Sequence, residues 1–192
     1  RLVIEDPNER KMLKVKVKGR LRKQGLTEFF FESAEPTFDE LDPADFFDRF
    51  PEGIYEIEGI TLDGEELESE VYLSHVMPAP AGGVTVSGVP YSEDCDEDVP
   101  EVGEPVIIAW EPVTDSHPDL GSEGPVEVTK YQLVVEIEES ETLVYSVDLP
   151  PGTTSLGVPE GFIALGEEFK YEILVREASG NQTAIESCFS VE

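Results

Sequence analysis

Apolar and polar residues alternate close to the start of the chain. From Leu13 to Leu21 the odd positions are apolar or glycine, and the intervening positions are Lys14, Lys16, Lys18 and Arg20, followed by Arg22. A period of two predicts a β-strand with one apolar face and a row of cations on the other. We interpret this row as a solvated face that also discourages edge-to-edge aggregation. The sharper alternative is a docking face for an acidic partner, which includes this chain's own acidic half.

The period changes after a second apolar run, Leu26–Phe31. Thr37 and Glu40 have the spacing of a capping box, and Asp42 followed by Pro43 is typical of a helix start. These signals predict a short helix near residues 37–50. Beyond it, Ile54–Leu62 and Leu67–His75 flank Asp63-Gly64, a dipeptide that favours the tight turn of a β-hairpin.

A segment rich in proline and glycine divides the chain. Residues 77–83 read Met-Pro-Ala-Pro-Ala-Gly-Gly, and proline cannot donate a hydrogen bond to a sheet while glycine adds flexibility. We therefore predict a boundary here, with a small β-rich domain at residues 1–80 that contains the short helix, and a second domain at residues 81–192.

The second domain shows short apolar segments separated by Pro, Gly, Ser and acidic turns, which is typical of an all-β sandwich. A polar loop is expected from Thr114 to Val126. The predicted strands are a first one near Val84, then Val106–Trp110, Lys130–Glu138, Leu143–Val147, Thr153–Val158, Phe169–Val175 and Thr183–Val191.

Several of these residues stand where a fibronectin type III domain has its characteristic ones. They are Trp110 in the second strand, Tyr131 in the third, and Leu165 six positions before Tyr171. The stretch from Val84 to Val191 therefore resembles that family. The resemblance implies an Ig-like antiparallel β-sandwich with these four residues in its core, and a tyrosine corner in which the Tyr171 hydroxyl bonds to the backbone.

The first half offers a vaguer resemblance. Its segments Phe29–Pro36, Phe50–Tyr55, Gly59–Gly64 and Ser74-His75 are similar to parts of uncharacterised bacterial exported proteins. That resemblance implies no activity. The fold class expected for the whole chain is mainly β, with two domains, the first a small mixed β domain with short helical turns.

Charge narrows the range of partners. The chain has 192 residues and a mass of 21.2 kDa, and its 13 Lys and Arg against 43 Asp and Glu give a formal net charge of −30. Residues 51–192 hold 32 of the acids and only 3 of the bases. Such a surface repels nucleic acid and anionic lipid headgroups. The longest apolar run, Val106–Trp110, is far below the roughly 20 residues of a membrane span, so we expect no membrane insertion.

The two cysteines provide information about the cellular compartment in which the protein acts. Cys95 and Cys188 are 93 positions apart and have no zinc-ligand spacing, so we predict one long-range disulfide, with two unrelated thiols as the alternative. Strand parity places Cys188 opposite Phe189, pointing outward. A disulfide indicates a secreted, periplasmic or cell-surface protein. The chain begins at Arg1 without Met, so we also expect a processed or truncated N-terminus.

One acidic segment has the spacing of a calcium loop. Asp94, Asp96 and Asp98 offer hard oxygen donors at alternating positions, but Val99 and Pro105 stand where an EF-hand needs Gly and Glu. The two interpretations are a looser calcium site and a solvated acidic loop. No cofactor is expected, apart from calcium under the first of these interpretations.

Catalysis is not expected. His75 and His117 each follow a serine, and sequence neighbours are poor candidates for a catalytic triad. We instead predict an exported binding or structural module for a protein or glycan partner. Its best surfaces are the turn Ala178–Gln182 and the loop residues Asp115, Ser116, His117 and Asp119.

Two alternatives stay open at this point. A carbohydrate-binding accessory module would need an exposed aromatic strip, for which Tyr55, Tyr72 and Tyr91 are the candidates. A calcium-stabilised adhesion unit would use the acidic segment. The sequence leaves the partner and the oligomeric state undetermined.

Overall fold

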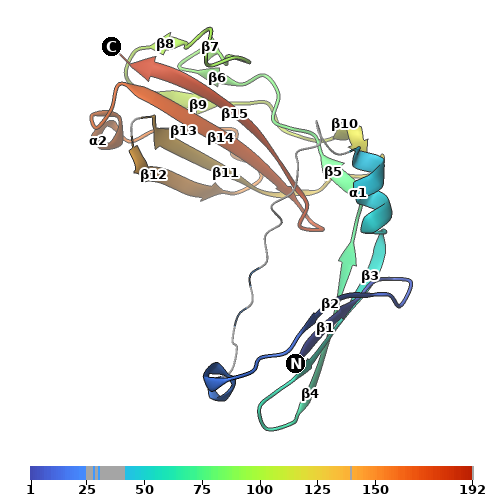
Figure 1. Ribbon diagram of the computed structural model, residues 1–192. Helices are drawn as coiled ribbons and strands as arrows, with labels where there is room; N and C mark the ends of the chain where they lie inside the picture. The colour runs from blue at the N-terminus through green and yellow to red at the C-terminus, as the bar shows by residue number, and fades with distance from the viewer. Residues whose placement is uncertain (25–27, 29, 31–41, 139, 192) are drawn as a thin grey trace. The chain divides into compact units, whose positions relative to one another are not determined.

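A computed structural model describes residues 1–24, 28, 30, 42–138 and 140–191 (Figure 1). The prediction of a mainly β protein is confirmed, because most of the described elements are strands. The chain divides into two compact units, Arg1–His75 and Val76–Glu192. Each unit is described by itself below.

The first unit is built on one four-stranded antiparallel sheet with the strand order β2-β1-β3-β4. Its strands are β1 (Leu2–Glu5), β2 (Lys11–Val15), β3 (Gly53–Ile60) and β4 (Glu66–Leu73), and its helices are the 3-10 helix η1 (Arg20–Lys23) and α1 (Pro43–Arg49). The predicted hairpin is present as β3 and β4. Its turn is closed by Thr61, whose Oγ1 accepts a hydrogen bond from the Glu65 amide at 3.0 Å, and Gly64 adopts a φ of 89°.

The basic segment is not one long strand. Strand β2 ends at Val15, and the chain then turns through Gly19 at a φ of 75° into η1. Only glycine adopts that left-handed conformation readily. The turn at Gly19 therefore prevents the strand from continuing to Leu21, although the alternation of residues continues. As a result, Lys16 and Lys18 lie beyond the strand.

Helix α1 begins where its capping signals indicated. The Asp42 carboxylate accepts a hydrogen bond from the Ala44 amide at 2.9 Å, and Pro43 occupies the first helical position. The remainder of the predicted helix, residues 37–41, and most of the apolar run Leu26–Phe31 lie outside the described residues.

The second unit contains two larger sheets that share one hydrophobic core. One has the order β12-β11-β14-β15-β8 and the other β13-β9-β6-β7, and a short pair, β10-β5, accompanies them. Figure 1 shows the two larger sheets lying one over the other. The elements are β5 (Val76–Pro78), β6 (Thr85–Val86), β7 (Val89–Pro90), β8 (Glu101–Val102), β9 (Ile107–Ala109), β10 (Ser116–Gly121), β11 (Val128–Ile137), β12 (Ser140–Leu149), β13 (Ser155–Gly157), α2 (Glu160–Ile163), β14 (Glu168–Glu177) and β15 (Gln182–Val191).

Three aromatic residues of the family resemblance are buried in this core. Trp110, Tyr131 and Tyr171 are each at most 5% exposed, and the ring centroids of Trp110 and Tyr131 lie 5.4 Å apart. Strand β11 shows how the alternation produces this core, since its residues from Tyr131 to Ile137 are buried at every second position. Burial also raises the pKa of Tyr171 to about 12.

Leu165 was wrongly assigned to the core. Its side chain is 58% exposed, because it lies in the turn that follows α2, where Ile163 and Phe162 supply the inward-facing side chains. The expected tyrosine corner is also absent from the described residues, where the Tyr171 hydroxyl makes no hydrogen bond to the backbone. The hydroxyl of another core tyrosine, Tyr131, does bond to the backbone: it accepts a hydrogen bond from the Val113 amide at 2.9 Å.

The proline- and glycine-rich segment belongs to the second unit. Val76–Pro78 form β5, Ala81 is 2% exposed in the core, and the Ala79 amide donates to the Asp115 carbonyl at 2.9 Å. The division between the units falls between His75 and Val76. Proline is tolerated at Pro78 because few residues of β5 are paired with β10.

Candidate interaction surfaces

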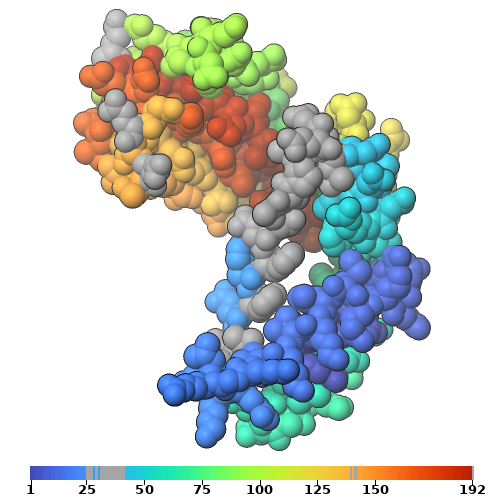
Figure 2. Space-filling view, in the orientation of Figure 1, coloured from blue at the N-terminus to red at the C-terminus, as the bar shows by residue number. Residues whose placement is uncertain are grey.

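The first unit carries a hollow of about 820 Å³ on one side of its sheet. Three segments form it: the first residues of β1, the turn region after β2, and the tip of the β3–β4 hairpin. Its lining consists of Arg1, Leu2, Val15, Lys16, Val17, Lys18, Gly19, Arg22, Glu28, Gly59, Ile60, Thr61, Leu62 and Leu67. We call it the basic hollow. Figure 2 shows the N-terminal segments, in blue, beside the blue-green hairpin.

Register explains why the floor of the basic hollow is apolar. Leu2 is paired with Val15 on one side and with Gly59 on the other, and Gly59 is paired with Leu67. Paired residues of neighbouring strands project to the same face, so three aliphatic side chains lie side by side there. Gly59 adds no side chain between them, which leaves the surface concave.

Cations also line the basic hollow, beside this apolar floor. Lys16, Lys18 and Arg22 are exposed, and none of them forms an ion pair within the described residues. Arg1 Nη2 lies 3.7 Å from Glu58 Oε2. Among the described residues of the lining, Glu28 is the one acid. The basic hollow can therefore attract carboxylates at its rim while apolar groups contact its floor.

The basic hollow was missed at the sequence level, although its cationic row was noticed. The row predicted a flat strand face, whereas its later residues wrap beside the sheet after the turn at Gly19. The one available signal was the apolar character of Ile60 and Leu62 at the hairpin tip. Nothing in the local pattern joins that tip to the N-terminal strand.

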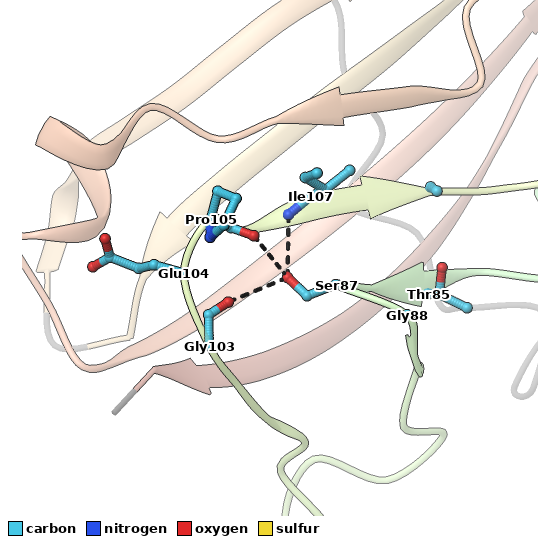
Figure 3. A pocket seen from close by; sticks show the side chains of 8 residues that line it. Thr85, Ser87, Gly88, Gly103, Glu104, Pro105 and Ile107 are labelled. Carbon is cyan, nitrogen blue, oxygen red and sulfur yellow. Dashed lines mark hydrogen bonds between the residues drawn. The ribbon is translucent and has the colours of Figure 1, made fainter.

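A second hollow, of about 500 Å³, lies on the second unit beside β6 and β9. Ser87, whose φ is 50°, is its central polar residue. Its Oγ lies 3.1 Å from the Pro105 carbonyl oxygen and 3.4 Å from that of Gly103, and it accepts from the Ile107 amide at 3.3 Å (Figure 3). These bonds attach the β6–β7 turn to the start of β9. The Glu104 carboxylate points away from Ser87 in Figure 3.

The predicted binding loop is partly a strand. Ser116–Gly121 form β10, which pairs with β5, so the expectation of a polar loop from Thr114 to Val126 was wrong over that range. Inside β10, the Nδ1 atom of His117 accepts hydrogen bonds from the amides of Asp119 and Leu120, each at 3.1 Å. His117 therefore stabilises the local backbone. Asp115 and Asp119 are exposed, and Ser116 is half-buried.

The carboxylates of the acidic segment do not converge on a common site. Asp94, Asp96 and Asp98 are all exposed, and Asp94 Oδ1 accepts from the Asp96 amide at 3.0 Å. Across the described ranges, no group of three or more His, Cys, Asp or Glu side chains is arranged to hold a metal ion. The arrangement is that of a capped turn.

A disulfide joins Cys95 to Cys188, with 5.9 Å between their Cα atoms. Cys188 lies outside the hydrophobic core, on the side that strand parity predicted, but it is only 4% exposed. The segment from Ser92 to Pro100 covers it. This segment is held to β15 by the disulfide and by bonds from Ser187 Oγ to the Ser92 carbonyl (2.8 Å) and from the Ser190 amide to the Pro100 carbonyl (2.9 Å).

The other singled-out residues are spread over both units. His75 Nε2 lies 2.7 Å from the Phe50 carbonyl oxygen, and its ring packs on Phe47. Of the three tyrosines considered for a carbohydrate site, Tyr72 is 54% exposed. Tyr55 is 7% exposed and donates to the Pro51 carbonyl at 3.1 Å, while Tyr91 packs against the core of the second unit.

The units differ sharply in charge. The first has 10 Lys and Arg and 19 Asp and Glu, and the second has 3 and 24. On the five-stranded sheet of the second unit, Glu172 is paired directly with Glu186. Burial, Glu186 and Glu136 together raise the pKa of Glu172. The basic hollow is thus the place where cations gather in a strongly acidic chain.

Within the described ranges, every helix is too short or too polar to span a membrane. Comparison with protein-family models and with curated protein sequences finds no match to this chain.

Proposed function

We propose that this chain is a non-enzymatic binding module, and that its first unit binds an acidic polypeptide segment in the basic hollow. The observation that carries the proposal is the combination of an apolar floor with exposed cations that form no ion pair with another described residue. Leu2, Val15 and Leu67 form the floor, and Lys16, Lys18 and Arg22 stand around it.

An extended segment with alternating acidic and apolar residues fits this geometry. Its apolar side chains contact the floor, and its carboxylates meet the rim. A chain of net charge −30 repels most acidic proteins over its surface as a whole, so a local cationic site gives such a partner one favoured place to bind. Salt weakens the attraction because the rim is exposed.

The test is a binding titration by fluorescence anisotropy. The probe is a labelled peptide of alternating Glu and Leu, and two comparison peptides replace Leu by Ser or Glu by Gln. We expect the Glu-Leu peptide to bind at low salt, each comparison peptide to bind more weakly, and about 0.5 M salt to reduce binding.

Variants locate the site. Lys16→Glu is expected to weaken binding of the Glu-Leu peptide by about tenfold, because it replaces attraction by repulsion at the rim. The matched control is Lys130→Glu, the same charge change at an exposed ion pair with Asp148 in the second unit, and it should leave the affinity nearly unchanged. Equal binding of the Glu-Ser peptide, or equal affinity in the Lys16 variant, contradicts the proposal.

The proposed module acts in an oxidising compartment, as a secreted, periplasmic or cell-surface protein. Support comes from the Cys95–Cys188 bond, since structural disulfides persist mainly outside reducing cytosol. Non-reducing mass spectrometry of thiol-blocked protein from its native cells tests this. Blocked Cys95 and Cys188 would place the chain in a reducing compartment.

The second unit, in this proposal, is a fibronectin type III-like sandwich that serves as a scaffold. Two facing sheets that are antiparallel except for the β15–β8 pair, together with the shared burial of Trp110, Tyr131 and Tyr171, support this assignment. The exposed Leu165 is its main departure from the family pattern.

A further inference from the structure

The sheet of the first unit has two edges of opposite charge. In the order β2-β1-β3-β4, the outer strands are β2 and β4, and no other described strand pairs with the outer side of either. Seven of the eight residues of β4 are exposed, all except Leu73. Unpaired strand edges are templates for the addition of another strand.

The strand directions allow these two edges to pair with each other between molecules. Each neighbouring pair in the sheet is antiparallel, so β2 and β4 also run in opposite directions. A second copy displaced within the plane of the sheet therefore brings its β2 beside β4 of the first copy in an antiparallel arrangement. The same displacement keeps each face of one sheet continuous with the same face of the next.

The side chains match on both faces. On one face, β4 carries Glu66, Glu68 and Glu70, and β2 carries Lys14. On the other face, β4 exposes Leu67 and Val71, which are 57% and 50% exposed. The corresponding face of β2 carries Leu13 and Val15, both half-buried. Cross-strand pairs of opposite charge and of apolar residues both stabilise a sheet.

Charge also selects among the pairings of two identical edges. A symmetric pairing of β4 with β4 would set glutamates against glutamates, and one of β2 with β2 would set lysines against lysines. Within one molecule, Glu68 and Glu70 already stand opposite Glu58 and Glu56, and like charges in that position destabilise a sheet. A neighbouring strand that carries lysines would offset this repulsion.

We propose that β4 of one copy adds to β2 of the next, so that this chain associates head to tail through the sheet of its first unit. The contact uses different surfaces on the two partners, so it leaves one edge free at each end of an assembly. Such contacts produce open-ended chains or closed rings, in contrast to symmetric dimers. The charge match does not depend on the basic hollow, since neither the glutamates of β4 nor Lys14 lines it, whereas Val15 and Leu67 belong to both surfaces.

Sedimentation velocity of the 192-residue chain at rising concentration tests the proposal. The weight-average mass is expected to rise beyond twice the single-chain mass at about 0.15 M salt, which screens the overall repulsion between two chains of net charge −30. Two charge-reversed variants, Glu68→Lys/Glu70→Lys and Lys11→Glu/Lys14→Glu, should each associate about tenfold more weakly than the original chain.

A mixture of the two variants supplies the decisive measurement. Each variant alone has two edges of like charge, whereas the mixture again offers opposite edges, so association should return only when both are present. Recovery also shows that both variants are folded. The matched control, Glu123→Lys/Glu127→Lys, makes the same charge change at exposed positions of the second unit and should associate as well as or better than the original chain. A single-chain mass at all concentrations, a mass that stops at two chains, or no recovery in the mixture overturns the proposal.

Discussion

The two units achieve their folds by different means. In the second unit, nineteen of the described apolar residues, from both sheets and from the segments that connect their strands, form one continuous core. Among the described hydrophobic residues of the first unit, only Val3 and Tyr55 are as fully buried as the residues of that core. A single sheet cannot bury both of its faces, so the first unit keeps apolar side chains such as Leu67 and Val71 partly in contact with solvent.

Polar contacts hold the turns of the first unit together. The fully buried Asp6 carboxylate accepts from the amides of Asn8 and Arg10, at 2.9 and 2.8 Å, and from Arg10 Nε at 2.7 Å. Burial alone would raise the pKa of Asp6, but these hydrogen bonds and the Arg10 charge outweigh it and lower that pKa. The unit with the smaller core therefore carries the uncovered surfaces on which both of our proposals rest.

The largest difference is expected from truncating a core residue. Ile173→Ala removes a side chain that is 0% exposed in β14 and should lower the free energy of unfolding of the second unit by about 2–5 kcal/mol. Val71→Ala in the first unit, where the side chain is half exposed, should change stability by less than about 1 kcal/mol. Trp110 is the only tryptophan in the chain, so its fluorescence during denaturant unfolding measures the effect of Ile173→Ala. Hydrogen exchange of the β3 and β4 amides measures the effect of Val71→Ala. Equal effects of both variants would contradict the comparison.

Opening the disulfide should also affect the second unit selectively. Cys95→Ala/Cys188→Ala removes a link between residues 93 positions apart and is expected to cost about 2–4 kcal/mol, mainly by enlarging the unfolded ensemble. Hydrogen exchange should show the greatest loss of protection in β15 and β8. Amides of β1 and β3 serve as the internal control, and a comparable loss there would argue against separate units.

A glycine in the first unit offers the corresponding test of its turns. Gly53 adopts a φ of 142°, and a Cβ at this position would lie 2.7 Å from Pro7 Cγ. Gly53→Ala should therefore destabilise the first unit by about 1–3 kcal/mol, measured by hydrogen exchange of the β3 amides. Gly64→Ala, which also requires positive φ but meets no atom within 4 Å, should cost less. If Gly64→Ala costs as much, contact with Pro7 is not the cause.

The smallest effect is expected from the acidic surface of the second unit. The pKa of Glu172 is raised in the folded state, first by burial and then by Glu186 and Glu136. The folded state therefore favours the protonated carboxyl of Glu172. This stabilisation is fully present below the unfolded pKa of Glu172 and is lost as pH rises through its folded pKa. Glu172→Gln should stabilise the second unit at pH 7 by a few tenths of a kcal/mol, reduced by solvent screening. The gain should vanish below about pH 4, and a gain that persists there would exclude this electrostatic cause.

Local signals in the sequence were sufficient for several elements. Alternation from Tyr131 to Ile137 predicted β11, the Asp63-Gly64 dipeptide predicted the β3–β4 turn, and the Asp42-Pro43 pair predicted the start of α1. Each of these features depends on φ and ψ preferences or side-chain periodicity over a few residues. The mainly β character of the chain follows from the same information.

Only the tertiary structure decided which surfaces are covered. The segment Ser92–Pro100 buries Cys188, and the turn after α2 exposes Leu165. Pro78, in β5, is paired with Ser116 of β10. The basic hollow and the oppositely charged sheet edges require β1 to lie between β2 and β3. Periodicity assigns a side chain to one face of its own strand, but contacts between segments far apart in the chain determine whether that face meets solvent or another part of the protein.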